Sequence, residues 1–212
     1  MFITLEGIEG SGKTTQIDYL VAFFEKKGYP CVTTREPGGT VIGNKIRAIL
    51  LDPECKGMDA KAELLLYMAD RAQHIHSLVK PSLAAGKTVL CDRYFDATVV
   101  YQGYARGLDI ELIKSLHSTL FKDLKPDVTI LLDLPPQVGL QRAWKQLNNG
   151  QRSNKEGRFE EEKLEFHKRV REGYLELAQA EADRFHVIDA AQEERKVRDS
   201  ILKIIGSIVV SL

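Results

Sequence analysis

Gly7-Ile8-Glu9-Gly10-Ser11-Gly12-Lys13-Thr14 is the stretch that decides the fold, because it fills every fixed position of the pattern GxxxxGK[ST]. Residues 2–6 before it alternate apolar and polar as a short strand does, and apolar residues after it recur at helical spacing. A strand, a glycine-rich turn and a helix in this order form a loop whose N–H groups converge on phosphate oxygens. We therefore expect residues 7–14 to bind a nucleoside triphosphate, with Lys13 on the β- and γ-phosphates and Thr14 on Mg²⁺. A glycine-rich turn that fits the pattern by chance is the alternative.

The composition limits the class of protein without naming a chemistry. The 212 residues suit one domain, and 30 Lys and Arg balance 30 Asp and Glu, which is not the basic footprint of a nucleic-acid binder. Cys31, Cys55 and Cys91 are an odd number without CxxC spacing; we expect small core residues of a reducing compartment, with Cys31 and Cys91 in buried strands, and no zinc site. The chain shows no targeting pattern and no apolar run of about 18 residues, so we expect a soluble, cytoplasmic protein without a membrane partner.

Short β-branched runs alternate with longer amphipathic stretches along the chain. The expected strands lie at residues 2–6, 31–34, 88–91, 128–132 and 185–188, and helices fill the intervals. This alternation predicts an α/β fold with a five-stranded parallel sheet and helices on both of its faces. Ligands in such folds bind beyond the carboxyl ends of the strands, so polar residues there are the candidates for a site.

Two expected strand ends carry such residues. The turn Thr33-Thr34-Arg35-Glu36-Pro37-Gly38-Gly39-Thr40 follows the second strand, and a plain connector and a ligand loop are equally compatible with it. Asp92 and Arg93 follow the third strand; the carboxylate is placed to hold Mg²⁺ and the guanidinium to grip a phosphate, unless the two form an ordinary surface ion pair.

A long helix is expected from Ala60 to Leu83, with a core-facing apolar stripe. Tyr67, Arg71 and His74 share another face of it. A ring that stacks on a base and a guanidinium that donates to a base carbonyl make a workable base reader, although a tyrosine capping the core beside a solvated arginine explains the same spacing.

A third basic region runs from Arg142 through Arg152 to Arg158, and residues 147–157 within it are polar, contain glycine and lack apolar periodicity. We expect a small lid at about residues 147–158. A solvated loop is the alternative, but phosphoryl transfer needs cations that arrive from a closing element.

The chain resembles the thymidylate kinase family over almost its whole length. The resemblance rests on motifs in this order: LEGIEGSGKTTQ, TREPGGTVIGNKIR, LLLYMADRAQHI, CDRYFDATVVYQGYARGL, TILLDLPPQVGLQRA, GRFEEEKLEFHKRVREGYLELA and VIDA. It implies a three-layer P-loop kinase fold in a single domain, residues 1–212, that uses ATP and Mg²⁺ to convert dTMP to dTDP, as a homodimer.

The resemblance also assigns roles to residues. For the sugar and phosphate of the acceptor nucleotide, it implies that Glu9 contacts the deoxyribose 3′-hydroxyl, that Arg93 and Arg47 bind the phosphate, and that the ring of Tyr101 crowds C2′ and so excludes ribose. For the base, it implies that Tyr67 stacks on thymine, that Arg71 binds the thymine O4, and that Thr98 and Gln102 contact the base edge. It also implies that Pro37 lies in the same pocket. For ATP it implies residues 7–14 (Gly7, Ile8, Glu9, Gly10, Ser11, Gly12, Lys13 and Thr14), with Arg142 against adenine and the backbone of residues 189–192 completing the adenine pocket. Thr14 and Asp92 are the implied metal-site residues.

Gly10 indicates the variety of the family in which the lid, and not the P-loop, supplies the catalytic arginine. Arg152 and Arg158 are then candidates, beside Lys13 and Arg93, for the catalytic set. Tyr67, Ala97 and Gly157 depart from the commoner phenylalanine, serine and aspartate.

Two other functions remain open from the sequence. One is another small nucleoside monophosphate kinase, for guanylate or adenylate. The other is a GTP-dependent binding module, which would need NKxD; the near match at residues 154–157 lacks the aspartate.

Overall fold

A five-stranded parallel sheet forms the centre of the computed structural model, which describes residues 1–122, 124–149 and 156–210. Its strands are β1 (Phe2–Glu6), β2 (Cys31–Arg35), β3 (Thr88–Asp92), β4 (Val128–Asp133) and β5 (Phe185–Asp189). They lie in the order β2-β3-β1-β4-β5, so the strand that leads into residues 7–14 is the central one. The α/β prediction and all five expected strands are confirmed.

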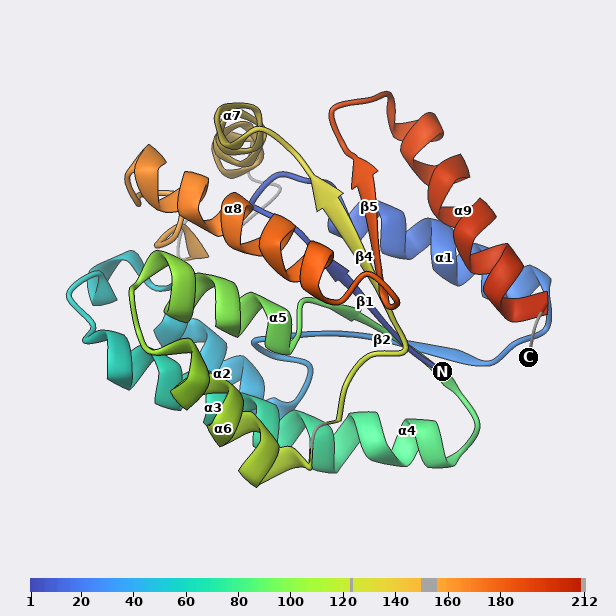
Figure 1. Ribbon diagram of the computed structural model, residues 1–212, viewed down its shortest axis with the longest axis horizontal. Helices are drawn as coiled ribbons and strands as arrows, with labels where there is room; N and C mark the ends of the chain where they lie inside the picture. The colour runs from blue at the N-terminus through green and yellow to red at the C-terminus, as the bar shows by residue number, and fades with distance from the viewer. Residues whose placement is uncertain (123, 150–155, 211–212) are drawn as a thin grey trace.

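Helices cover both faces of this sheet. The helices are α1 (Lys13–Lys26), α2 (Val41–Leu51), α3 (Ala60–His74), α4 (Lys80–Ala84), α5 (Phe95–Thr98), α6 (Ile110–Phe121), α7 (Pro136–Asn148), α8 (Leu164–Ala180) and α9 (Glu194–Val210), with a 3₁₀ turn η1 (Pro53–Cys55). Figure 1 shows α1 and α9 together on one face and α2 to α6 with α8 on the other. Among the described residues, no helix is both long and apolar enough to cross a membrane.

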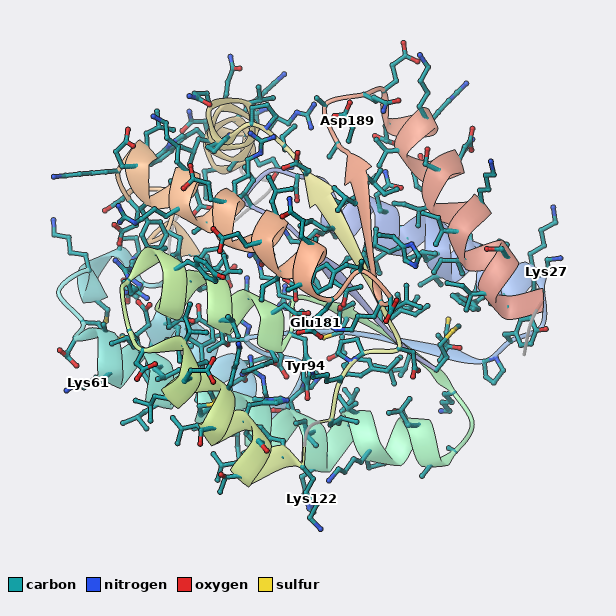
Figure 2. All side chains as sticks on the ribbon, viewed as in Figure 1. Lys27, Lys61, Tyr94, Lys122, Glu181 and Asp189 are labelled. Atoms are coloured by element: carbon teal, nitrogen blue, oxygen red, sulfur yellow. The ribbon has the colours of Figure 1, made fainter. Side chains whose placement is uncertain are left out.

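The core is continuous across the central strands. Every residue of β1 is buried, as are nearly all of β3 and β4, because helices cover both of their sides. Tyr94, which follows β3, is fully buried in the interior, whereas the labelled Lys27, Lys61 and Lys122 project outward at the periphery (Figure 2).

The expectation that Cys31 lies in a buried strand is wrong. Cys91 on β3 is buried, but Cys31 is only partly buried, because β2 is an edge strand with half-exposed and exposed residues. An apolar run does not distinguish an edge strand from a central one.

The expected helix at residues 60–83 is present but is not uniformly α. Between α3 and α4 lies a π-helical segment, η2 (Ile75–Val79), and a second one, η3 (Val99–Ala105), follows α5. In η3 the N–H of Arg106 donates to the carbonyl of Tyr101, five residues earlier. This wider turn sets the direction of the side chains that η3 carries, among them Tyr101 and Gln102.

Candidate active site

Residues 7–12 form a tight loop between β1 and α1. Gly7, Gly10 and Gly12 all have positive φ, between 70° and 137°, a region that other residues rarely adopt. Lys13 begins α1 and folds back over the loop: its Nζ donates to the carbonyls of Gly7 (3.1 Å) and Ile8 (3.0 Å). The loop is thus closed around one cation at the N-terminus of a helix, an arrangement suited to phosphate.

The loop also presses against the first turn of α7. A Cβ added to Gly10 would lie 2.1 Å from the carbonyl oxygen of Gly139, and one added to Gly139 would lie 2.4 Å from that of Glu9. No side chain fits at position 10 without moving backbone, so this loop has no room for a cation of its own there. Sequence reasoning missed Gly139, because nothing in a helical pattern shows that a distant loop approaches it.

A cleft of about 460 Å³ opens beside this loop and brings together most of the expected site residues. It is lined by Glu9, Gly10, Gly12, Lys13, Thr14, Pro37, Arg47, Tyr67, Arg71, Asp92, Arg93, Thr98, Tyr101 and Gln102. These residues come from the loop after β1, the start of α1, the loop after β2, α2, α3, the end of β3, α5 and η3, at the carboxyl edge of the sheet. The lining does not include Gly7, Ile8, Ser11, Arg142 or Arg158, and Arg152 lies outside the described residues.

Arg93 and Glu9 form a charged pair at the centre of the cleft. Arg93 Nη2 donates to Glu9 Oε1 at 3.0 Å, and its Nη1 donates to the hydroxyl of Tyr101 at 2.8 Å. Burial raises the pKa of Glu9, but Arg93 and His167 outweigh burial, and the pKa falls below its usual range. Glu9 is therefore ionised. The backbone of Arg93 has a φ of 67°, which is a strained value for a non-glycine residue.

His167 on α8 stands behind Glu9. It is fully buried, and its Nδ1 lies 3.2 Å from Glu9 Oε2. The two carboxylate oxygens of Glu9 therefore face different groups, Oε1 towards Arg93 and Tyr101 and Oε2 towards His167. The sequence marked His167 only as part of an amphipathic helix.

Arg71 on α3 is almost fully buried and firmly held. Its Nε donates to Glu36 Oε2 at 2.8 Å, and its Nη2 donates to Thr98 Oγ1 at 2.8 Å and to the carbonyl of Tyr94 at 3.2 Å. Nη1 has only the thioether of Met68, at 3.9 Å, among the described residues. Because sulfur is a weak acceptor, Nη1 keeps donor capacity for a ligand in the cleft.

Gln102 presents the opposite polarity. Its Nε2 donates to Glu63 Oε1 at 2.8 Å, which fixes the amide orientation because a carboxylate only accepts. Its Oε1 is buried and has no hydrogen-bond partner among the described residues. The cleft thus offers a free donor from Arg71 and a free acceptor from Gln102.

Arg47 on α2 is engaged by a residue that lies within the expected lid, Glu156. Its Nε and Nη2 donate to the two carboxylate oxygens of Glu156, at 3.1 and 2.9 Å, and its Nη1 donates to the carbonyl of Pro37 at 3.0 Å. Glu36 and Pro37 are joined by a cis peptide bond. The carboxylate of Glu156 therefore occupies the Arg47 guanidinium, which is expected to bind the acceptor phosphate.

Arg158 is not at the cleft. It is 2% exposed, its Nη2 forms an ion pair with Glu63, and its Nε donates to the carbonyl of Leu50 at 2.5 Å. Glu63 also accepts from Arg106, which pairs with Glu162 as well. The segment after residue 155 is thus anchored to α3 by a buried charge cluster.

Arg142 on α7 lies beside the end of β5, where the adenine pocket is expected. Its Nη1 donates to the carbonyl of Ala190 at 3.1 Å. Asp189 Oδ1 in turn accepts from the N–H of Ala191 at 2.9 Å, which shapes the turn after β5.

Comparisons with known proteins identify the family of this chain. The family model described as Thymidylate kinase matches residues 5–201. The chain belongs to the thymidylate kinase family. It is 60% identical to the thymidylate kinase of Desulforapulum autotrophicum over 202 residues, which are 95% of this chain and 89% of that protein. The thymidylate kinase of Desulfosudis oleivorans is 58% identical over 190 residues, 90% of this chain and 89% of that protein.

A solved structure supports the same assignment. The crystal structure of thymidylate kinase from Ehrlichia chaffeensis superposes with a TM-score of 0.76 at 35% identity, covering 97% of this chain and 98% of that one. As a thymidylate kinase, the chain catalyses the ATP-dependent phosphorylation of dTMP to dTDP, a step of dTTP biosynthesis.

The sequence did not predict a role for three polar residues at the cleft of this thymidylate kinase. Glu36, Glu63 and His167 each hold a residue that lines the cleft, but none was assigned a role. Glu36 stands in the quoted motif TREPGGT, which drew attention to the loop but not to its carboxylate. Buried carboxylates that orient other side chains leave no periodic signal, so only the fold reveals them.

Proposed function

We propose that Arg71 and Gln102 read the acceptor base as thymine. The observation that carries the proposal is the opposed polarity of Arg71 Nη1, a free donor, and Gln102 Oε1, a free acceptor, in one cleft. Thymine offers an O4 acceptor next to an N3–H donor, whereas cytosine offers the reverse pattern. With Tyr67 stacked on the ring and Thr98 holding Arg71, the pocket would reject cytosine because it would leave buried groups unpaired.

The phosphates would be held by cations on both sides of the transfer. Lys13 would leave its loop carbonyls for the β- and γ-phosphates of ATP, while Arg93 and Arg47 would hold the phosphate of dTMP. Glu9 would accept from the 3′-hydroxyl, and the Tyr101 ring would crowd C2′ against ribose. Because the acceptor is already an anion, positioning and charge neutralisation would supply most of the catalysis, with no strong general base.

Thr14 and Asp92 fit a magnesium site. Both line the cleft next to Lys13 and offer the hydroxyl and carboxylate oxygens that Mg²⁺ prefers. When bound with ATP, Mg²⁺ would neutralise charge on the β- and γ-phosphate oxygens.

The remaining cation would come from the segment expected to form the lid, residues 147–158. Arg152 and Arg158 are the two proposed sources. The ion pair of Arg158 with Glu63 favours an anchoring role for Arg158, so Arg152 would be the cation at the transferring phosphate. Arg142, which contacts the backbone after β5, would pack against adenine.

A coupled ADP-release assay with ATP, Mg²⁺ and a panel of nucleoside monophosphates tests the proposal. We expect turnover with dTMP, and kcat/KM for dCMP lower by at least about 10²-fold. Turnover of guanylate or adenylate would overturn the base assignment, and nucleotide binding without turnover would support a binding module.

The pH dependence of ATP use should report Lys13. Burial, and next the charge of Arg93, lower the pKa of Lys13 from 10.5 to about 8. The empty enzyme therefore loses this charge as the pH rises through about 8, so kcat/KM for ATP should be level near pH 7 and fall above pH 8, approaching about tenfold per unit. Initial rates at low ATP from pH 6.5 to 9.5 measure this. A level profile up to pH 9.5 would contradict it.

Glu156 should compete with the acceptor phosphate for Arg47. In Glu156→Gln the guanidinium loses its charged partner, so we expect the KM for dTMP to fall about three- to fivefold while the KM for ATP stays unchanged. Glu161→Gln, an exposed neighbour, is the matched control. An unchanged or higher KM for dTMP in Glu156→Gln would speak against this competition.

We also propose a homodimer, in a cytoplasmic location to which three free thiols are suited. Support for the dimer comes from exposed apolar side chains on three adjacent helices, α2, α3 and α6 (Figure 1). They are Val41, Ile42, Ile49, Leu65, Leu112 and Leu120. A second copy of the chain would cover this surface.

A charge in this surface should dissociate the dimer. Leu65 is 62% exposed, so Leu65→Glu should leave the fold intact but give a monomer of 23.9 kDa in sedimentation velocity, where the parent sediments at twice that mass. Tyr29→Glu, at a position that is also exposed but does not belong to the three helices, should remain dimeric. A parent that sediments as a monomer would end the proposal.

A further inference from the structure

His74 is a buried histidine at the end of α3, three residues after Arg71, and the phosphoryl-transfer chemistry does not use it. Its ring is fully buried, and both of its nitrogens have polar contacts. Nδ1 lies 2.7 Å from Glu36 Oε1, and Nε2 lies 2.7 Å from the hydroxyl of Thr34. The ring thus bridges β2 to the loop that follows it, at the base of the cleft.

Glu36 carries this contact to Arg71. Its two oxygens are divided, since Oε1 faces His74 and Oε2 accepts from Arg71 Nε at 2.8 Å. Burial raises the pKa of Glu36, but the charge of Arg71 and the hydrogen bond with His74 outweigh burial and lower the pKa. An ionised carboxylate only accepts, so His74 Nδ1 carries the hydrogen and donates it to Oε1.

This division decides which donors of Arg71 remain for a ligand. With Oε1 held by His74, Glu36 reaches Arg71 through one oxygen, and within the described part of the chain Nη1 keeps only the weak sulfur acceptor of Met68. Without the Nδ1 donor, Oε1 would be a buried, unpaired carboxylate oxygen. It would then be stabilised by turning towards Nη2, which lies on the same edge of the guanidinium as Nε, because carboxylates prefer paired contacts with arginine. There it would compete with Thr98 and the carbonyl of Tyr94, which hold Nη2, and the guanidinium would turn so that Nη1 is displaced from the base.

We propose that His74 is a positioning residue for base selection: its Nδ1–H holds Glu36 in the single-oxygen contact that keeps Arg71 Nη1 available to the acceptor base. The inference rests on the proposed base-reading role of Arg71. It concerns selection between bases, so its effect differs from that of a histidine that only supports the fold.

Asparagine and glutamine provide a matched pair of variants. The shorter asparagine side chain would place its amide near the position of Nδ1, and the longer glutamine side chain near that of Nε2, so His74→Asn keeps a donor for Glu36 and His74→Gln loses it. We expect His74→Gln to lower the ratio of kcat/KM for dTMP to that for dCMP about tenfold, mainly through KM for dTMP, with the KM for ATP unchanged. His74→Asn should stay within about 1.5-fold of the parent ratio. His76→Gln, at an exposed position two residues later, is the control.

A packing role predicts a different result. The ring also lies 3.2 Å from where a Cβ of Gly39 would be, so it supports the loop of residues 36–40. If that support were its whole role, His74→Asn and His74→Gln would act alike and would weaken dTMP and dCMP equally, leaving the ratio unchanged, which would overturn the proposal. Thr34→Val removes the contact at Nε2 without removing the ring, and a fall of about threefold in the ratio is expected. If the His74 variants do not fold, Thr34→Val distinguishes the two roles, because an unchanged ratio in Thr34→Val would then overturn the proposal.

Arg71→Gln in the same assay separates this inference from the function on which it rests. If Arg71→Gln collapses the ratio and His74→Gln does not, His74 has no part in base selection while the function stands. If Arg71→Gln leaves the ratio unchanged, both the base-reading role and the inference fail.

Discussion

Lys13→Ala should lower kcat/KM for ATP and dTMP about 10³-fold while the protein stays folded. Lys13 is the cation at the start of α1, and its Nζ now donates to Gly7 O, Ile8 O and, at 3.3 Å, Ser11 Oγ. These contacts close the empty loop, and in the proposed mechanism ATP phosphates replace them. Alanine removes the only side-chain cation that the loop of residues 7–14 contains, so the charge developing on the transferring group would lack its nearest partner.

The measurement is the coupled ADP-release assay together with a thermal unfolding curve. Lys26→Ala, an exposed lysine at the end of the same helix, controls for helix propensity and net charge and should keep full activity. Lys13→Arg should also be poorly active, because a planar guanidinium does not replace an ammonium that bonds three loop acceptors. Activity near that of the parent in purified Lys13→Ala would show that the loop does not hold the transferring phosphates.

The sequence predicted the glycine-rich loop and the polar residues at the end of β3 because their constraints are local. A glycine needed for positive φ, a lysine at the start of a helix and an aspartate at a strand end are all read from neighbouring residues. Five of residues 7–14 line one cleft with Asp92 and Arg93; they are Glu9, Gly10, Gly12, Lys13 and Thr14. The five strands were predicted for the same reason, since β-branched runs are local. The π-helical turns η2 and η3 were not, because an apolar stripe does not resolve one extra residue per turn.

What the sequence did not predict depends on long-range contacts. Glu63 and Arg158 are 95 positions apart, and Glu9 and His167 approach across the whole domain. Each of these residues by itself has the pattern of a solvated charge or of an amphipathic helix. Pairing is decided by how α3, α8 and the segment after residue 155 pack, so the sequence could not distinguish an anchoring arginine in the expected lid, Arg158, from a catalytic one.

Arg158→Met is therefore the second decisive substitution, with a large expected effect on stability. Arg158 and Glu63 are both almost fully buried, and removing Arg158 leaves the charge of Glu63 compensated only by the partly exposed Arg106, which also pairs with Glu162. We expect the free energy of unfolding to fall by about 3–5 kcal/mol. For a domain of this size that is a decrease in Tm of roughly 6–20 °C, measured by calorimetry or circular dichroism.

The activity of the same variant separates the two proposed roles of Arg158. At a temperature where Arg158→Met is folded, an anchoring residue should change kcat less than about tenfold, whereas a cation at the transferring phosphate should change it by about 10³. Arg106→Met is the matched control, because Arg106 also meets Glu63 but is 20% exposed and should cost less stability. Replacing both partners, Glu63→Met with Arg158→Met, should recover part of the stability lost in Arg158→Met, since no buried charge of that pair is left unpaired. An unchanged Tm with a 10³-fold loss of kcat in Arg158→Met would instead mean that Arg158 leaves Glu63 during the reaction and acts at the phosphate itself.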